Sequence, residues 1–209
     1  MDTIKKIFIC IFTLMLISGC VNIKSKYIQP NIYTIQHHPL NDVIKIKIDK
    51  SIFIKEFDVG GELATNKIVV YDRNNLYYHN YHLWVLPLDE LLTNYISNRF
   101  TSYNSFAKGV WTSIFSTSPD YILECKINAL QITNSNEENS VEIILTAYLH
   151  KYSTDSKDYQ ICFSNNYSKK ENSNDFKLEK MIVMTGSIMS EITDNILEDI
   201  IEYDTSLTK

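Results

Sequence analysis

Five histidines and a serine-rich loop carry the side chains with which this chain could hold a metal or attack a substrate. The histidines are His37, His38, His79, His82 and His150, and none belongs to a His-Glu-x-x-His or Cys-x-x-Cys array. His79 and His82 could clamp a metal, but on a strand their side chains are expected to face opposite ways. Ser113, Ser116 and Ser118 lack the Gly-x-Ser-x-Gly elbow of a hydrolase. The sequence therefore predicts no catalytic residue, no metal site and no cofactor.

Cys20 is the residue whose surroundings point most directly to a chemical modification. Two lysines are followed by an apolar run over residues 7–17, and a Ser-Gly pair directly precedes Cys20. As a helix with about 1.5 Å of rise per residue, the run spans about 16 Å, against about 30 Å for the hydrocarbon core of a bilayer. A charged start, an apolar middle and small residues at the end are typical of a secretory signal peptide.

The residues around Cys20 resemble the bacterial lipobox, here Ile17-Ser18-Gly19-Cys20. The resemblance implies that residues 1–19 form a lipoprotein signal peptide and that Cys20 is acylated. Two or more acyl chains anchor a protein stably, since each buried methylene contributes about 0.8 kcal/mol. Val21 replaces the Asp associated with inner-membrane retention, so the resemblance places the anchor in the outer membrane, facing the periplasm. An ordinary signal peptide with an incidental Cys20 is the alternative.

The composition favours one exported globular domain. The chain has 209 residues, 44% of them hydrophobic, and a formal net charge of −5, which argues against nucleic acid or an anionic lipid surface as the main partner. Residues 20–42 are polar and interrupted by two prolines, so we expect an extended tether. Within it, residues 32–35 could pair as an edge strand. The folded domain is expected over residues 43–205.

The mature chain keeps two cysteines besides Cys20. Cys125 shares one strand face with apolar residues and is expected to point into the core. The apolar set Tyr159, Ile161 and Phe163 leaves Cys162 on the opposite face, away from the core. Because opposite faces of a sheet do not bridge, we expect two free thiols, although an oxidising periplasm favours disulfides.

Two groups of strands, each followed by a helix, account for the hydrophobic pattern. The expected strands are an alternation through Ile44, Ile46 and Ile48, a hairpin over 66–73 and 76–83, and a meander over 121–132, 140–152 and 159–170. Amphipathic helices are expected from Pro87 to Phe100 and from Leu178 to Ile200, with Gly186 as the weak point of the second. This order predicts an α+β fold, with an antiparallel or mixed sheet and both helices on one face.

The stretch "IVVYDRNNLYYHNYHLWVLPLDELLTNYISNRF", residues 68–100, resembles the signature of the ABC-type transport auxiliary lipoproteins, the group that includes paraquat-inducible protein C. In that family a Tyr-x-Leu-like segment, here residues 33–35, follows the lipidated cysteine, and a Tyr-rich strand pair leads to a Trp and a Pro, here Trp84 and Pro87. The resemblance implies a fold similar to the N-terminal domain of TolB. It also implies a non-catalytic role beside an ABC permease, its ATPase and a mammalian-cell-entry (MCE) type periplasmic protein in lipid transport between the two membranes.

The tyrosines of the hairpin are the candidate partner-binding residues. Trp84 is expected to pack in the core, whereas Tyr78 or Tyr81 is expected to be exposed and to bind a partner protein, since tyrosine is rigid and has a polar tip. The strands leave no second apolar face for a lipid cavity, so an adaptor is expected rather than a carrier. A structural or assembly lipoprotein of the outer membrane, or a lipid-anchored periplasmic hydrolase, remains the alternative.

Overall fold

A three-stranded antiparallel meander forms the long part of the sheet. The computed structural model describes residues 28–40, 46–73, 75–113, 118–153 and 156–207. The meander consists of β7 (Tyr121–Asn134), β8 (Asn139–Ser153) and β9 (Asp158–Ser173), paired in that order. Tyr121, Leu123 and Cys125 of β7 are fully buried, because alternate side chains of a strand share one face. The predicted meander is confirmed.

Short strands complete the sheet along the other edge of β7. They are β1 (Asn31–Tyr33), β2 (Ile52–Ile54), β3 (Asp58–Val59), β4 (Lys67–Asp72), β5 (Asn75–Trp84) and β6 (Val110–Trp111). β2, β3 and β4 each run parallel to β7, and β6 runs parallel to β2. β5 forms the predicted antiparallel hairpin with β4, and β1 lies parallel to β5 on its outer edge. The sheet is therefore mixed and open.

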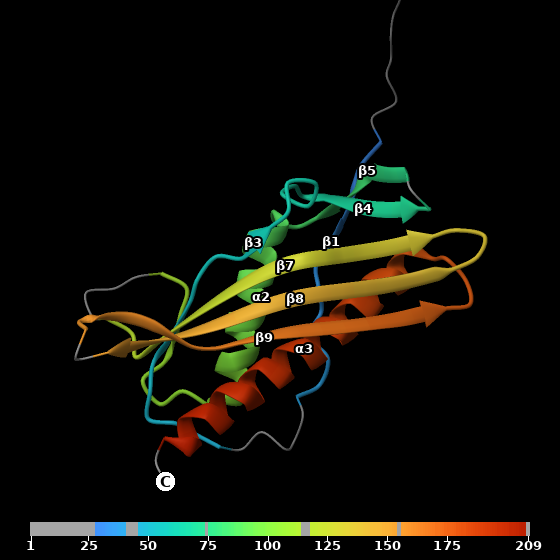
Figure 1. Cartoon of the computed structure of the whole chain (residues 1–209). Coiled ribbons are helices and arrows are strands. Elements are labelled where there is room, and N and C mark those ends of the chain that lie inside the picture. Colours follow the sequence, from blue (N-terminus) through green and yellow to red (C-terminus); the bar gives the residue numbers. More distant parts are fainter. Residues whose placement is uncertain (1–27, 41–45, 74, 114–117, 154–155, 208–209) are drawn as a thin grey trace, which may run out of the picture.

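Two helices, α2 (Leu88–Tyr103) and α3 (Leu178–Ser206), cover one face of this sheet (Figure 1). α2 begins after Pro87 and has acidic residues in its first turn, where they favour the positive end of the helix dipole. It ends at Asn104, whose left-handed backbone (φ 53°) is a common helix stop. The predicted α+β fold with both helices on one face is confirmed.

The two predicted helical stripes form the core against the sheet. Each buried leucine or isoleucine contributes about 1.5–3 kcal/mol. The buried residues of the stripes include Leu88, Leu91, Leu92, Tyr95, Ile96, Arg99 and Phe100 in α2, and Met181, Ile182, Ile188, Ile192, Ile196 and Ile200 in α3. Within the described ranges, neither helix has the combination of length and apolar character that crossing a bilayer requires.

The expected strand through Ile44, Ile46 and Ile48 does not form over its described part. Ile46 is exposed, and Ile48 makes a single parallel bridge to Phe106; Ile44 lies outside the described residues. Pairing with β7 begins only at Ile52, which lies beside Tyr121. The alternation was misleading because a strand also needs a neighbouring strand to pair with, and local pattern does not supply one.

Candidate functional site

The hairpin of β4 and β5 presents tyrosines to solvent and keeps its tryptophan inside. The exposed fractions are 52% for Tyr77, 43% for Tyr78 and 50% for Tyr81, against 3% for Trp84. The Trp84 backbone N–H donates to the Asn66 carbonyl at 2.7 Å, which fixes the end of β5 beside the core. The expected exposure of Tyr78 or Tyr81 is confirmed, while their binding of a partner stays a prediction.

An irregularity in the hairpin brings His79 and His82 together. Lys67 pairs with Leu83, whereas Val69 pairs with Tyr78, so β5 contains extra residues between these pairs. The ring centroids of His79 and His82 lie 5.2 Å apart in an edge-to-face arrangement. The expectation that the two side chains face opposite ways is therefore wrong, because it assumed a regular strand. No group of three or more metal-ligating His, Cys, Asp or Glu side chains occurs in the described part of the chain.

A polar contact connects the histidine pair to β1 and α3. The Tyr33 hydroxyl donates to Glu179 Oε1 at 3.2 Å and lies 3.0 Å from His82 Nδ1. Burial and, to a smaller extent, His82 lower the pKa of His79. The backbone N–H of Glu179 and the Tyr33 hydroxyl both lower the pKa of the Glu179 carboxyl. Tyr33 thus connects β1, where the N-terminal segment enters the folded domain, to both β5 and α3.

Residues 34–39, which we call the strap, pack along the two helices rather than extending away as a tether. Ile35 is buried, and the His37 ring stacks on Tyr95 with centroids 4.1 Å apart. The His38 N–H donates to Ser190 Oγ at 3.2 Å. With β1 in the sheet, the folded domain begins near residue 31, so the expected boundary at 43 is too late. The expected edge strand within residues 32–35 is present as β1 over Asn31–Tyr33.

A buried ion pair fixes the end of the strap. Arg99 of α2, only 2% exposed, binds Asp194 of α3 through two hydrogen bonds, Nε to Oδ1 at 2.5 Å and Nη2 to Oδ2 at 2.6 Å. Its Nη1 also donates to the His38 carbonyl at 2.9 Å. Burial lowers the pKa of Arg99, but the hydrogen bonds and charge attraction from Asp194 outweigh this effect. The pKa of Arg99 is therefore raised. The sequence indicated this buried position of Arg99 only by placing a basic residue inside an apolar helical stripe.

Gly186 allows the strap to approach α3 closely. A Cβ at this position would lie 2.6 Å from the Gln36 carbonyl oxygen. The Tyr95 hydroxyl donates to the Gly186 carbonyl at 3.2 Å and lies 2.6 Å from Ser190 Oγ, so α2 is fixed at the same place. The glycine that the sequence suggested as a weak point is therefore a contact point between three segments.

The two described cysteines are free thiols, as expected, although for a different reason. Phe163 pairs with Leu149 and Ile161 pairs with His150, so Cys162 is the extra residue of a bulge in β9. It lies beside Tyr203 of α3, on the side covered by the helices. The expectation that Cys162 faces away from the helices is wrong, and Cys125 does not bridge to it because β8 lies between their strands.

The sheet face away from the helices is polar. Asn128 Nδ2 donates to Thr146 Oγ1, and Thr146 Oγ1 donates to Asn166 Oδ1, both at 2.6 Å, which links β7, β8 and β9. Glu124 forms an ion pair with Lys55 at 3.2 Å. Lys47 lies elsewhere and donates to Asn104, directly after α2.

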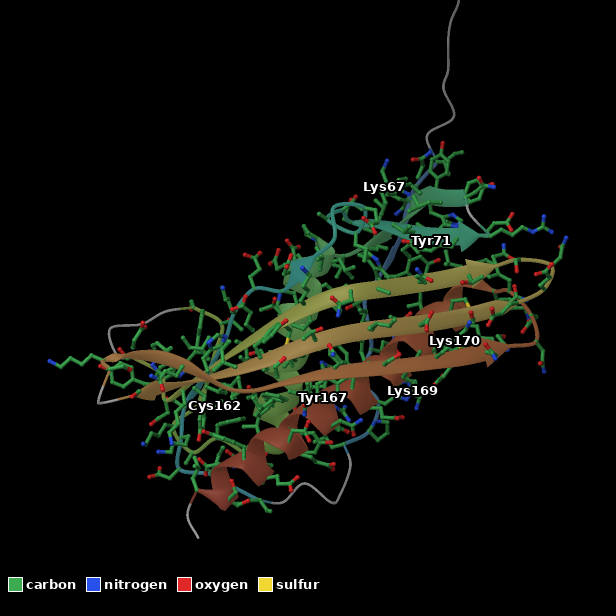
Figure 2. All side chains as sticks on the ribbon, viewed as in Figure 1. Lys67, Tyr71, Cys162, Tyr167, Lys169 and Lys170 are labelled. Carbon is green, nitrogen blue, oxygen red and sulfur yellow. The ribbon has the colours of Figure 1, made fainter. Side chains whose placement is uncertain are left out.

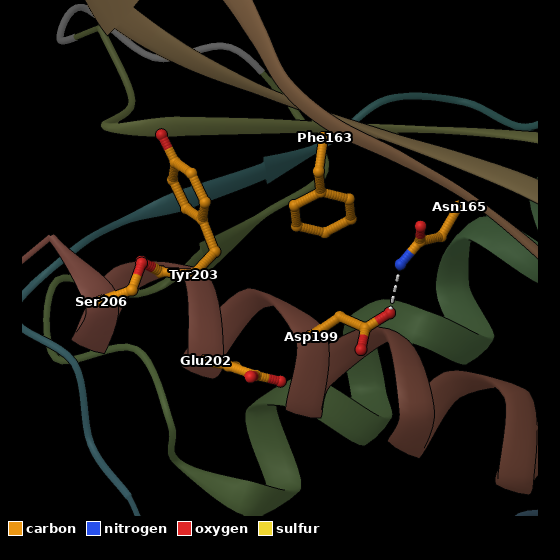
Figure 3. Close-up of a pocket in the computed structure, with 6 residues that line it drawn as sticks. All are labelled: Phe163, Asn165, Asp199, Glu202, Tyr203 and Ser206. Carbon is orange, nitrogen blue, oxygen red and sulfur yellow. Dashed lines mark hydrogen bonds between the residues drawn. The ribbon is translucent and has the colours of Figure 1, made fainter.

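The surface hollows of the described part of the chain include one beside α3 and one beside α2, and polar groups line part of each. The first has a volume of about 280 Å³ and lies between β9 and the end of α3; its lining residues are Phe163, Asn165, Asp199, Glu202, Tyr203 and Ser206 (Figure 3). Asn165 Nδ2 donates to Asp199 Oδ2 at 2.7 Å. The second, of about 580 Å³, lies between the strap and α2, and its lining combines the apolar Ile35, Val85, Leu86 and Leu91 with the amides of Gln36, Asn94 and Asn98. Carboxylates and amides suit water or a protein partner better than an acyl chain.

Solved structures with a similar fold are known, although no family model and no curated protein matches this chain. Protein XCC0632 from Xanthomonas campestris, of family DUF330, is similar with a TM-score of 0.72 and 13% identity over 85% of this chain and 98% of that chain. An uncharacterized protein has a TM-score of 0.63 at 15% identity, over 83% and 99% of the two chains. The hypothetical protein CT253 from Chlamydia trachomatis has a TM-score of 0.51 at 9% identity, over 76% and 99%. These similarities establish the fold.

Cys20 and the signal peptide expected over residues 1–19 lie outside the described residues. Of the candidate site residues, the structure therefore places Tyr78 and Tyr81. The structure also shows the strap packed on both helices, which the sequence did not predict.

Proposed function

We propose that this protein is a lipoprotein of the outer membrane, anchored through acylated Cys20 on the periplasmic side. We propose further that it is a non-catalytic auxiliary subunit of an MCE-type ABC transport system that moves lipids between the inner and outer membranes. The observation that carries the proposal is the hairpin, which exposes Tyr78 and Tyr81 beside a buried Trp84. This hairpin lies within residues 68–100, the stretch that resembles the ABC-type transport auxiliary lipoproteins.

The position of β1, where the N-terminal segment enters the folded domain, supports a role in presenting the hairpin near the membrane. β1 pairs with the end of β5, with Tyr33 opposite Trp84, so the chain enters the domain beside the hairpin. Because the folded part begins near residue 31, the chain from Cys20 to Pro30 reaches at most about 3.3 Å per residue, or roughly 35 Å. The anchor would therefore hold the tyrosines within a limited distance of the outer membrane, accessible to periplasmic subunits.

The same features support an adaptor rather than a carrier. A lipid carrier needs a largely enclosed apolar cavity of several hundred Å³. The first hollow described above has two carboxylates in its wall, and the second is a surface hollow with amide side chains among its apolar residues. The open sheet face is also polar, with the Asn128–Thr146–Asn166 hydrogen bonds across it. In this proposal the acyl chains are the protein's own lipid contact, and the domain binds proteins.

A mild-detergent pull-down of the full chain from its own cells, followed by mass spectrometry, tests the proposal. The wild type is expected to bring the MCE-type protein, the permease and the ATPase. Tyr78→Ala or Tyr81→Ala is expected to reduce their recovery at least about ten-fold, which corresponds to about 1.4 kcal/mol. Tyr152→Ala, at an exposed tyrosine on β8, is the matched control and is expected to change nothing.

The outcomes separate the alternatives. Recovery of outer-membrane structural or assembly proteins without transport subunits would favour the structural lipoprotein. Normal recovery of transport subunits by both tyrosine variants, with normal folding, would show that the hairpin is not the binding surface.

A further inference from the structure

The outer edge of β5 is open over residues 75–81. β1 covers this edge only at residues 82–84, and no strand in the described part of the chain pairs with 75–81 on the side away from β4. In an antiparallel pair, alternate residues direct their N–H and C=O groups away from the partner strand. The part of this edge that keeps a regular register with β4 is residues 75–78, which is about 13 Å long at about 3.3 Å per residue. This length provides backbone hydrogen bonds for a further strand.

The opposite edge of the sheet is protected in a way that the β5 edge is not. β9 carries Lys169, Lys170 and Glu171 along its second half, where Figure 2 labels the two lysines, and a bulge at Cys162 interrupts its first half. Charged side chains and bulges on an edge strand both discourage pairing with another chain. Residues 75–81 contain no Lys, Arg, Asp, Glu or Pro. Their one titratable group apart from tyrosine is His79, whose pKa is lowered mainly by burial, so it adds little charge near pH 7. Native proteins normally protect or cover such an edge.

The chain's own N-terminal segment does not continue to pair along this edge of β5. β1 is parallel to β5 with Asn31 opposite His82, so continuing the same register would place Pro30 opposite Tyr81. Proline has no N–H to donate to the ladder, and residues 28–30 form no strand. The pairing that β1 begins therefore stops where the open edge starts.

A second copy of this chain fits the edge less well than a separate segment. In an antiparallel pairing of two β5 strands, the β1 strand and residues 28–30 of each copy would lie at one end of the seven-residue edge. The turn that contains Arg73 of the other copy would meet them there. A short extended segment of another protein can end before these obstructions.

We infer that residues 75–81 of β5 bind an extended, uncharged segment of a partner protein, which adds to the sheet as a further strand. Tyr77 and Tyr78 are neighbours in a strand and so point to opposite faces, and both are exposed. An added strand would therefore meet a tyrosine ring on each face, where β-branched or aromatic side chains pack well. The inference deepens the proposed function and depends on it only for the identity of the partner, expected among the transport subunits.

Site-specific photo-cross-linking in the protein's own cells tests this inference. Benzoylphenylalanine replaces Tyr77, Tyr78 or Tyr81 in turn, and Ile161 of β9, which is 60% exposed, serves as the control on the other edge. The first three positions are expected to cross-link to one continuous segment of one partner, and position 161 is not. The wild-type complex is then purified, and its amide hydrogen exchange is compared with that of the free protein.

In the complex, alternate amides within the regular part of the edge, residues 75–78, are expected to exchange at least ten-fold more slowly, while those of β9 keep their rates. A partner cross-linked at these positions without slower exchange would overturn the inference, because side-chain docking would then explain the contact. Cross-links from residues 75–81 to a second copy of this chain, cross-links confined to position 161, or no cross-links at all would also overturn it. A segment from a protein outside the transport system, with the same protection, would support the added strand while contradicting the proposed function.

Discussion

Replacing Gly186 by alanine is expected to destabilise this protein, although the same change stabilises most helices. In a helix interior, alanine is favoured over glycine by about 1 kcal/mol. Here the new Cβ would lie 2.6 Å from the Gln36 carbonyl oxygen, and the nearest atoms belong to backbone that cannot rotate away. The strap must then move, which weakens its contacts with Tyr95 and Ser190. Overpacking of this kind costs about 1–3 kcal/mol. After the helical gain of about 1 kcal/mol is subtracted, we expect a net loss of up to about 2 kcal/mol in the free energy of unfolding.

Urea unfolding of the mature, non-acylated chain measures this change. Gly61→Ala is the matched control, because a Cβ at Gly61 meets no atom within 4 Å. The control is expected to leave stability unchanged or to raise it by up to about 1 kcal/mol, through the reduced freedom of the unfolded chain. If Gly186→Ala is more stable than the wild type by about the 1 kcal/mol that alanine gains in an unobstructed helix, the close packing of the strap on α3 is wrong.

Three further variants test other parts of the account. Cys20→Ala should abolish palmitate labelling of the chain in cells, and labelling that persists would exclude Cys20 as the acylated residue. Arg99→Met should cost about 3–5 kcal/mol in urea unfolding, because Asp194 is left as a buried charge without its partner; a loss below about 1 kcal/mol would contradict the buried pair. Burial opposes ionisation of Asp120, but its hydrogen bonds from Ser51, with two nearby lysines, hold the pKa of its carboxyl below the ordinary value. A lowered pKa stabilises the fold above the unfolded value of about 3.9 and loses that effect as the pH falls through the folded value. Asp120→Asn should therefore lower the melting temperature at pH 7, with the difference from wild type shrinking in acid. A difference that stays constant down to pH 2 would argue against this origin.

The parts of the fold with strong local patterns could be predicted from the sequence. The stripe from Leu88 to Phe100 repeats at three- and four-residue spacing, and the structure has α2 over Leu88–Tyr103. The meander and the hairpin were predictable for the same reason, since each strand alternates and each turn is short and polar. Alternation alone would place Tyr78 and Trp84 on one face, because they are six residues apart. Their different exposure was expected instead from the polar tip of tyrosine and from core packing of the tryptophan.

The parts that could not be predicted depend on bulges and on contacts between distant segments. One extra residue in β9 moved Cys162 to the helix-covered side, and extra residues in β5 brought His79 and His82 together. The strap reads as a polar tether because its partners, Arg99 and Gly186, lie some sixty and one hundred and fifty residues further along the chain. An arginine in an apolar stripe was visible in the sequence, but its partner was not.

Native mass spectrometry of the mature, non-acylated protein purified from its own cells tests the central claim, that this chain is an adaptor and not a lipid carrier. The account predicts the mass of the bare chain, without bound phospholipid, because one hollow has carboxylates in its wall and the other places amides among its apolar residues at the surface. Phospholipid bound in a one-to-one ratio and retained through purification would contradict the adaptor and favour a carrier.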